Sequence, residues 1–424
     1  MLIVFIAFII FLIVGMPIAF AVGISGALFF VQHSNLPATI MVQMPLTQAQ
    51  NFALLAVPLF IFAGNLLNCG GTTDRLAKFA GILTGRMRGG YAQTSVVLST
   101  MMGGVSGSAI ADAAMEARLL GGDMKKAGYS KGFIACNIAF TGLITATVPP
   151  GNAMIIYGTT GNVSIGKLFT TGLVVGLFMM LVMMFTTWMI AAIRGYKPAR
   201  TEKAKPREVW EAFKECFWAL LFPVILLVGI RTGLFTPSEV GAFACVYAAF
   251  VGVFIYKEIK IKDICKIVYG GVKSAAGIML IVAATQAFGW VITRAGIPQK
   301  MAQTFTSSIT NPLVFVFAVC VILLVAGCFI DAVPALLIFA PIFCPTADAY
   351  GINMIYFGVV MVIVLCIGLA TPPVGINLYV ASSVGGQPVH KIIPHLPIPL
   401  LAIFVGTVIV ILVPEIITFL PNVL

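Results

Sequence analysis

The sequence predicts an all-α polytopic membrane protein, from its composition and from the placement of its charges. Of the 424 residues, 60% are hydrophobic and only 9% are charged, whereas a soluble domain carries about 25% charged residues. At about 20 residues per span, the hydrophobic residues would fill up to roughly 12 membrane helices. The net charge of +11 does not indicate nucleic-acid binding, because the basic residues stand in short clusters between apolar runs.

Four basic clusters set the predicted orientation of the chain in the membrane. They occupy residues 75–88, 118–131, 194–214 and 257–273. Cytoplasmic loops are enriched in Lys and Arg, so we expect all four on the cytoplasmic side. The stretch 33–53 contains no Lys or Arg, and we expect it outside.

The first half then divides into elements in order. Residues 1–31 form either one long helix or two short ones separated at Gly15-Met16-Pro17. Residues 88–118 begin and end on the same side, which predicts a re-entrant helical hairpin or a pair of short helices. Residues 131–160 cross outward with a break at Val148-Pro149-Pro150-Gly151, because adjacent prolines cannot continue a helix. Residues 172–193 return to the basic cluster that follows.

The second half has the same order of elements. Spans 217–235 and 239–256 leave the cytoplasmic side and come back to it, and 274–293 crosses outward. A second hairpin is expected over 313–345. A broken helix over 355–384, interrupted at Thr371-Pro372-Pro373, and a last span over 399–421 complete the half.

This shared order predicts an inverted-topology repeat if residues 1–31 are two spans. Residues 1–195 would form the first repeat and 216–424 the second, joined by a basic cytoplasmic linker over 196–215. The motif Thr145-x-x-Val148-Pro149-Pro150 recurs as Gly368-x-x-Thr371-Pro372-Pro373. Each hairpin also carries a glycine-containing turn and an aspartate.

The two proline breaks are the predicted binding region. Carbonyls that lose their helical partners before Pro149 and Pro372 suit a small hard cation such as Na⁺. The helix that restarts at Gly151 or at Val374 points a positive dipole end at the same region, which suits a carboxylate. The alternative is that the prolines only kink two packed helices.

The turn at residues 102–108 is the expected partner of the first break. Its hydroxyls, Ser106 and Ser108, add oxygen ligands and its glycines permit close approach. The alternative is that these small residues serve tight helix packing. The corresponding turn at residues 327–331 has fewer hydroxyls but includes Asp331.

Charged side chains within apolar segments are costly and usually functional. Asp112, Glu116 and Asp331 lie in or beside the hairpins. The aspartates either coordinate a cation or hold the hairpins through backbone bonds. Arg294 closes its span on the outer side, where it either pairs with an anionic substrate or extends to the interface.

Several of these motifs together resemble the large membrane subunit of TRAP transporters, over essentially the whole chain. They are Gly15 to Phe20, Pro58 to Asn65, Val105 to Ser108 and the two Pro-Pro breaks. The resemblance implies a multi-pass protein of the bacterial inner membrane, in the ion-transporter superfamily. It implies Na⁺-coupled uptake of a carboxylate by an elevator motion. It also implies two partners, a small four-helix membrane subunit and a periplasmic substrate-binding protein.

The resemblance also implies roles for individual residues. One Na⁺ site would use Ser106 and Ser108 with backbone of Thr145, Val148 and Pro150. A second would use Gly327 or Cys328 with Gly368, Thr371 and Pro373. The substrate cavity would involve Asp112, Arg294, Asp331, Gly151 and Asn152. Cys328 stands where an oxygen-bearing side chain would be easier to explain.

The elevator implied by the family needs a scaffold and a moving core. We expect scaffold helices over 1–50, 165–195, 216–273 and 390–424, and a transport core over about 51–164 and 274–389. The apolar spans 1–31 and 217–256 are the expected docking face for the small subunit. Substrates of the family include sialic acid and C4-dicarboxylates, and the turn at 107–112 favours sialic acid.

The sequence bears on two other functional classes. An ion channel or passive anion pore is the alternative, because inverted repeats with broken helices occur there too. An enzyme is not expected, because the sequence offers no nucleophile–base pair or metal cluster.

Overall fold

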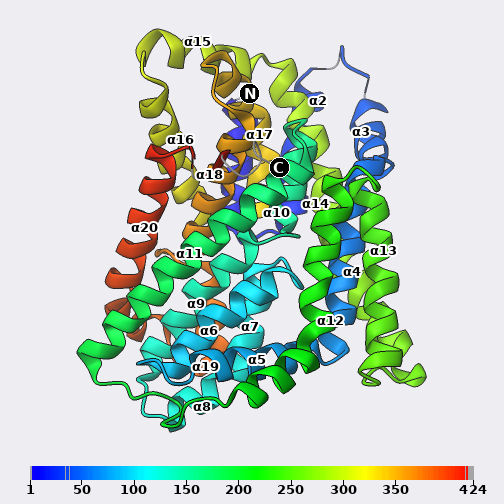
Figure 1. Cartoon of the computed structure of the whole chain (residues 1–424). Helices are drawn as coiled ribbons and strands as arrows, with labels where there is room; N and C mark the ends of the chain where they lie inside the picture. The colour runs from blue at the N-terminus through cyan, green and yellow to red at the C-terminus, as the bar shows by residue number, and fades with distance from the viewer. Residues whose placement is uncertain (1, 34, 38, 416, 419–424) are drawn as a thin grey trace.

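The computed structural model describes residues 2–33, 35–37, 39–415 and 417–418, and the regular elements in this part of the chain are all helices (Figure 1). The first half contains α1 (Leu2–Ile13), α2 (Ile18–Gln32), α3 (Thr39–Ala49), η1 (Phe52–Leu55), α4 (Ala56–Cys69), α5 (Thr72–Thr84), α6 (Gly90–Gly103), α7 (Ala109–Leu119), α8 (Gly121–Lys126), α9 (Lys131–Thr147), α10 (Asn152–Thr160) and α11 (Ile165–Arg194). The second half contains α12 (Pro206–Arg231), α13 (Pro237–Phe250), η2 (Val251–Ile255), η3 (Ile261–Asp263), α14 (Ile264–Arg294), α15 (Ile297–Ser308), α16 (Pro312–Gly327), α17 (Ala332–Ala349), α18 (Met354–Leu369), α19 (Ile376–Gly385), η4 (Val389–Lys391), η5 (Ile393–His395) and α20 (Pro397–Leu412).

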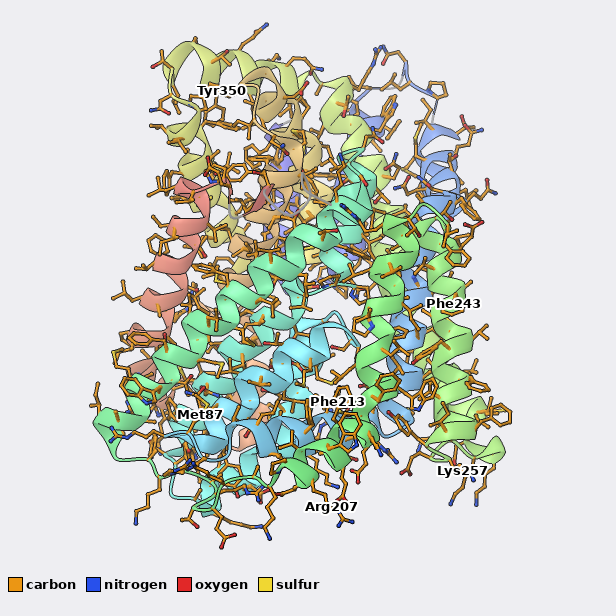
Figure 2. The ribbon with its side chains drawn as sticks, viewed as in Figure 1. Met87, Arg207, Phe213, Phe243, Lys257 and Tyr350 are labelled. Atoms are coloured by element: carbon orange, nitrogen blue, oxygen red, sulfur yellow. The ribbon has the colours of Figure 1, made fainter. Side chains whose placement is uncertain are left out.

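The helices have the length and composition of membrane spans. Within the described residues, 6 helices are long and apolar enough to cross a bilayer, or up to 8 if each sharply bent pair of helices is one span. Figure 2 places Arg207 and Lys257, from two different basic clusters, at one end of the molecule and Tyr350 at the other. This distribution and the all-helical fold confirm an integral, multi-pass membrane protein.

The breaks lie where the prolines predict them. The first helix ends at Ile13 and the second begins after Pro17, so the described residues of the expected 1–31 segment form two helices. At the first Pro-Pro pair, α9 and α10 are bent by 43°. At the second, α18 ends at Leu369 and α19 starts at Ile376.

Both predicted hairpins are present. In the first, Ser99 of α6 reaches Asp112 of α7 and Ser95 reaches Glu116, a pairing that only antiparallel neighbours allow. In the second, the rings of Phe315 at the start of α16 and Tyr350 just after α17 stack with centroids 4.9 Å apart. Each hairpin is therefore two antiparallel helices joined by a short turn.

Several helices have no counterpart among the expected elements, and several boundaries differ. They include α3, α5 and α15, which are too short or too polar to give the signal of a span. The helix α14 begins at Ile264, ten residues before the expected 274. The expected last span, 399–421, is too long, because α20 ends at Leu412, just before Pro414, and residues before a proline disfavour helical backbone. Residues 416 and 419–421 of that expected span lie outside the described part.

The helices pack as two bundles. In one, α4 lies against α13 and α14, and α14 lies against α2 and α3. In the other, α6, α7, α9, α11, α18 and α19 pack on one another, and α20 packs on α11 and α18. Figure 1 shows α20 and the α12–α13 pair on opposite flanks of the molecule.

The expected division into scaffold and core stays a prediction. That expectation placed α4 in the core, and α11 and α20 in the scaffold. In the structure α4 packs on α13, and α11 packs on α6, α9 and α20. Hydropathy finds apolar helices but does not say which neighbour each one faces.

Candidate functional site

The turn of the first hairpin sits directly on the first proline break. Gly107 has φ +58°, and a Cβ there would collide with the carbonyl oxygen of Pro150. The backbone N–H of Asn152 donates to the carbonyl oxygen of Gly107 at 3.4 Å. A Cβ on Gly103 would likewise collide with Val148. Glycine is therefore required for this close approach of two backbones.

The two serines of this turn keep much of their hydrogen-bonding capacity. The hydroxyl of Ser106 donates to the carbonyl oxygen of Met102 at 3.4 Å, and that of Ser108 accepts from the backbone N–H of Ala111 at 3.4 Å. Both distances lie beyond the usual range for such bonds. Each hydroxyl oxygen thus retains lone pairs for a further partner.

The carbonyls before the break are freed as the sequence predicts. Residues 149 and 150 are prolines, so the carbonyls of Thr145 and Ala146 have no helical N–H four residues on. The Thr145 carbonyl oxygen lies 3.2 Å from where a Cβ of Gly103 would be, on the hairpin side. The Thr147 carbonyl instead faces Gly172 of α11. The structure therefore brings Ser106, Ser108 and the break together.

The second hairpin meets the second break in a corresponding way. The backbone N–H of Gly375, which follows the prolines, donates to the carbonyl oxygen of Cys328 at 2.9 Å. A Cβ on Gly368 would lie 2.5 Å from the carbonyl carbon of Gly327, so these two helices touch through backbone. Both proline breaks thus bind the turn of the hairpin in their own half.

Side-chain oxygen is scarcer at this second junction. The Cys328 thiol contacts the carbonyl oxygens of Leu324 at 3.2 Å and Pro372 at 3.6 Å. The Thr371 hydroxyl donates to Ile367 in its own helix at 2.7 Å, and Pro373 is exposed. The structure gathers Gly327, Cys328 and Gly368, and leaves the Thr371 hydroxyl occupied locally.

A buried polar network inside the first hairpin was not predicted as a unit. The Glu116 carboxyl is fully buried and contacts the hydroxyls of Ser95 at 2.6 Å, Ser99 at 2.9 Å and Thr141 at 2.9 Å. These three hydroxyls come from α6 and α9. Glu116 therefore joins both arms of the hairpin to the helix that leads into the first break.

Asp112 belongs to the same network. Its Oδ2 accepts from Ser99 at 2.7 Å and Thr145 at 2.6 Å, and its Oδ1 has no hydrogen-bond partner among the described residues. The Ser99 hydroxyl has one proton, so it can donate to only one of its two carboxyl neighbours at a time. Hydroxyl contacts, rather than backbone bonds, tie this aspartate into the hairpin.

The spacing of these residues in the sequence indicates polar helix faces. Ser95 and Ser99, Asp112 and Glu116, and Thr141 and Thr145 are three pairs of polar residues four positions apart within apolar segments. Such spacing places both members of a pair on one face of a helix. The pattern marks three polar faces, and the structure shows that they meet.

The remaining predicted substrate residues lie elsewhere. Asp331 is half-buried and is the N-cap residue of α17, as Ser108 is of α7, so the position equivalent to it in the first hairpin is Ser108 rather than Asp112. Arg294 is exposed in the last turn of α14 and has no ion pair within the described residues. The structure does not bring Arg294 into contact with either aspartate.

Comparison with known proteins gives a consistent result over the whole chain. Residues 5–416 match the family described as the DctM component of tripartite ATP-independent periplasmic transporters. The chain is 35% identical over 408 residues to a sialic acid TRAP transporter large permease of Vibrio cholerae, covering 96% of this chain and 95% of that protein. It is 37% identical to a 2,3-diketo-L-gulonate large permease of Escherichia coli, covering 88% and 87%, and 34% identical to a C4-dicarboxylate large permease of Pseudomonas aeruginosa, covering 95% and 94%.

Proposed function

This chain belongs to the DctM component family of tripartite ATP-independent periplasmic transporters, and on that premise we propose that it is the membrane subunit through which a carboxylate is taken up with Na⁺. The observation that carries the proposal is the docking of each hairpin turn on a proline break. In both halves an N–H after the prolines donates to a carbonyl of the turn, at Gly107 and at Cys328. Freed backbone at membrane depth is tolerated where it lines a cavity or binds a ligand.

The same correspondence supports an inverted-topology repeat. The order of helix pair, span, amphipathic helix, hairpin, broken helix and final helix occurs in both halves. The contacts between halves are also reciprocal, because α2 packs on α14 as α13 packs on α4, and α7 packs on α19 as α17 packs on α10. We propose that the two hairpins are re-entrant from opposite sides of the bilayer.

In an elevator mechanism, one of the two bundles would be the fixed scaffold and the other the moving core. The packing favours a scaffold of α1–α4 and α12–α14, and a core of α6–α11 and α16–α20. The helices α5 and α15 then connect the bundles. Sliding of this core would carry both hairpin–break junctions across the membrane together, and only different affinities for Na⁺ and substrate in the two positions can drive it.

The first Na⁺ site would use the Ser106 and Ser108 hydroxyls with carbonyls of Thr145, Val148 and Pro150. The second would use backbone at Gly327 or Cys328, Gly368, Thr371 and Pro373, with fewer side-chain oxygens. The carboxylate would bind at the N-terminal end of α10, at Gly151 and Asn152. Asp331 and Arg294 would come close to it when the core has moved to its other position in the membrane. We assign Asp112 to positioning of the hairpin, since its bonded oxygen is committed to Ser99 and Thr145.

Sequence identity does not select the substrate. Permeases named for sialic acid, 2,3-diketo-L-gulonate and C4-dicarboxylates are 34–37% identical to this chain. The three named substrates are all carboxylates, so these relatives share a substrate class but not a single substrate. A panel of these three acids in one uptake assay identifies the substrate, with sialic acid as the first candidate.

The proposed partners are a small membrane subunit and a periplasmic substrate-binding protein, in a bacterial inner membrane. Two apolar grooves lie on the scaffold side, one of about 390 Å³ between α2, α3 and α14, and one of about 280 Å³ between α4, α13 and α14. Phe20 and Val246 line these grooves and are 55% and 68% exposed. Cysteine crosslinking to the small subunit from Phe20 and Val246, with none from the hairpins, would support docking here.

Uptake into proteoliposomes with both partners present tests the first Na⁺ site. The double substitution of Ser106 and Ser108 by alanine should raise the Na⁺ concentration needed for half-maximal uptake. Ser164→Ala is the matched control, because Ser164 also caps a helix, α11, but lies outside both junctions. An unchanged Na⁺ dependence in the double variant would exclude this site.

A further inference from the structure

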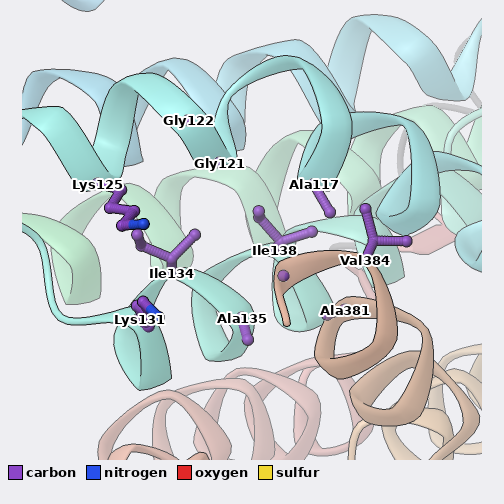
Figure 3. Close-up of a pocket in the computed structure, with 11 residues that line it drawn as sticks. Ala117, Gly121, Gly122, Lys125, Lys131, Ile134, Ala135, Ile138, Ala381 and Val384 are labelled. Atoms are coloured by element: carbon purple, nitrogen blue, oxygen red, sulfur yellow. The ribbon is translucent and has the colours of Figure 1, made fainter. Parts of the chain in front are cut away.

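A cavity at the basic end of the core has no role in the proposed mechanism. It has a volume of about 190 Å³ and lies between α7, α8, α9 and α19. In Figure 3 its walls come from Ala117 of α7, Ile138 of α9 and Ala381 of α19, with two lysines at one end. The cavity therefore lies at the seam where the first half of the chain meets the second.

The two lysines at this cavity are available for an anion. Lys125 of α8 and Lys131 at the start of α9 both line it, and Figure 3 shows them on either side of Ile134. No carboxylate lies within 4.0 Å of either amine among the described residues. The nearby Asp123 pairs with Lys126 instead, at 3.4 Å. The lining itself contains no acidic residue.

The rest of the lining is small and apolar. Besides the lysines it contains alanines, glycines, isoleucines and a valine. A Cβ added at Gly121, Gly122 or Gly385 would meet nothing within 4 Å, so the mouth is open. The first turn of α9 adds a positive dipole end beside Lys131. The site thus combines two positive charges with an apolar floor.

We propose that this cavity binds a small organic anion. Its carboxylate or phosphate would lie between the amines of Lys125 and Lys131, and its carbon skeleton against Ala117, Ile138 and Ala381. The volume of about 190 Å³ corresponds to about six waters at roughly 30 Å³ each, which is enough for a short-chain acid or a phosphate group. A bound anion would link α8 and α9 to α19, and so bridge the two halves of the core.

The proposal is independent of which substrate is transported, and chemical labelling of the lysines tests it. The protein is reconstituted in nanodiscs of zwitterionic lipid and treated with an acetylating reagent. The rate of acetylation of each lysine is then measured by mass spectrometry. Butyrate and inorganic phosphate are the probes, with chloride at equal ionic strength as the reference. At a probe concentration about tenfold above its dissociation constant, labelling of Lys125 and Lys131 should slow about tenfold, because only the unbound fraction reacts.

Lys126 is the internal control, since it is the next residue to Lys125 and pairs with Asp123. Its labelling should not change with either probe. Protection that appears only in nanodiscs containing phosphatidic acid, without added probe, would identify a lipid headgroup as the source of the anion. Equal protection of Lys126, or no protection of Lys125 and Lys131 in any condition, would overturn the proposal.

Two variants separate binding in the cavity from attraction to charge at the surface. Ala381→Phe fills the floor and leaves both lysines, so it should remove the selective protection. Lys131→Gln leaves the cavity and removes one charge, so it should weaken the protection of Lys125 even if the first variant does not fold. Protection of Lys125 that persists unchanged in Lys131→Gln would contradict the proposed site.

Discussion

The substitution Thr145→Val isolates the bond between the first break and the hairpin. The Thr145 hydroxyl is fully buried and donates to Asp112 Oδ2 at 2.6 Å, and its oxygen also lies 2.9 Å from the carbonyl of Ser99. Valine has nearly the same shape, so the change removes the hydroxyl without opening a cavity. Leaving a buried carboxyl with one donor fewer should lower the free energy of unfolding by about 1–3 kcal/mol.

Thr147→Val is the matched control on the same helix. The Thr147 hydroxyl is also buried, but it donates only to the carbonyl of Ile144 at 2.8 Å, which already accepts from the backbone N–H of Val148. Its loss should cost about 0.5 kcal/mol, at the low end for a hydrogen bond. The comparison therefore separates the network from the general effect of removing a threonine hydroxyl.

Reversible unfolding in mixed micelles measures both variants. Combining Thr145→Val with Asp112→Asn completes a double-mutant cycle, in which a coupling energy of about 1 kcal/mol or more is expected between contacting groups. If the two threonine variants lose the same free energy of unfolding, or if the coupling energy between positions 145 and 112 is zero, the role assigned to the network is refuted. Because valine keeps the backbone carbonyl at 145, the Na⁺ dependence of uptake should remain.

Further substitutions test the two junctions and the surface. Gly107→Ala forces a side chain into left-handed backbone, which costs about 1–2 kcal/mol before any collision, and should lower both thermal stability in detergent and uptake. Gly368→Ala places a Cβ 2.5 Å from the backbone of α16 and should destabilise by about 1–3 kcal/mol, whereas Gly277→Ala in α14, which meets nothing within 4 Å, should be neutral or stabilising. The exposed pair of Lys78 and Glu215, at 2.6 Å, should show a coupling energy below about 1 kcal/mol in a double-mutant cycle.

The features that follow from proline chemistry were predictable from the sequence. The breaks after Thr147 and Leu369 lie where prolines remove the backbone donors, and the pairing of each break with a glycine-containing turn follows from the order of elements. These inferences rest on local backbone chemistry and on the order of elements along the chain. The structure has both breaks at the prolines and both turns in contact with them.

The features that depend on tertiary packing were not predictable in this way. The helix α11 is apolar on all sides, so its sequence gives no indication that it packs on α6 and α9 rather than with the scaffold. The amphipathic helices α5 and α15 lack the length and hydropathy of spans. The sequence marks Glu116 as a charge beside an apolar segment, but its partners lie on two other helices, and only the fold shows that their polar faces converge.

Counterflow in proteoliposomes tests the central claim most directly, because it separates a carrier from a passive pore. Vesicles that contain the complex are loaded with unlabelled carboxylate and Na⁺ and diluted into labelled carboxylate with equal Na⁺. A Na⁺-dependent carrier should accumulate label transiently above its external concentration, and should stop doing so when Na⁺ is replaced by choline. Label that only equilibrates, at a rate independent of Na⁺, would contradict the account.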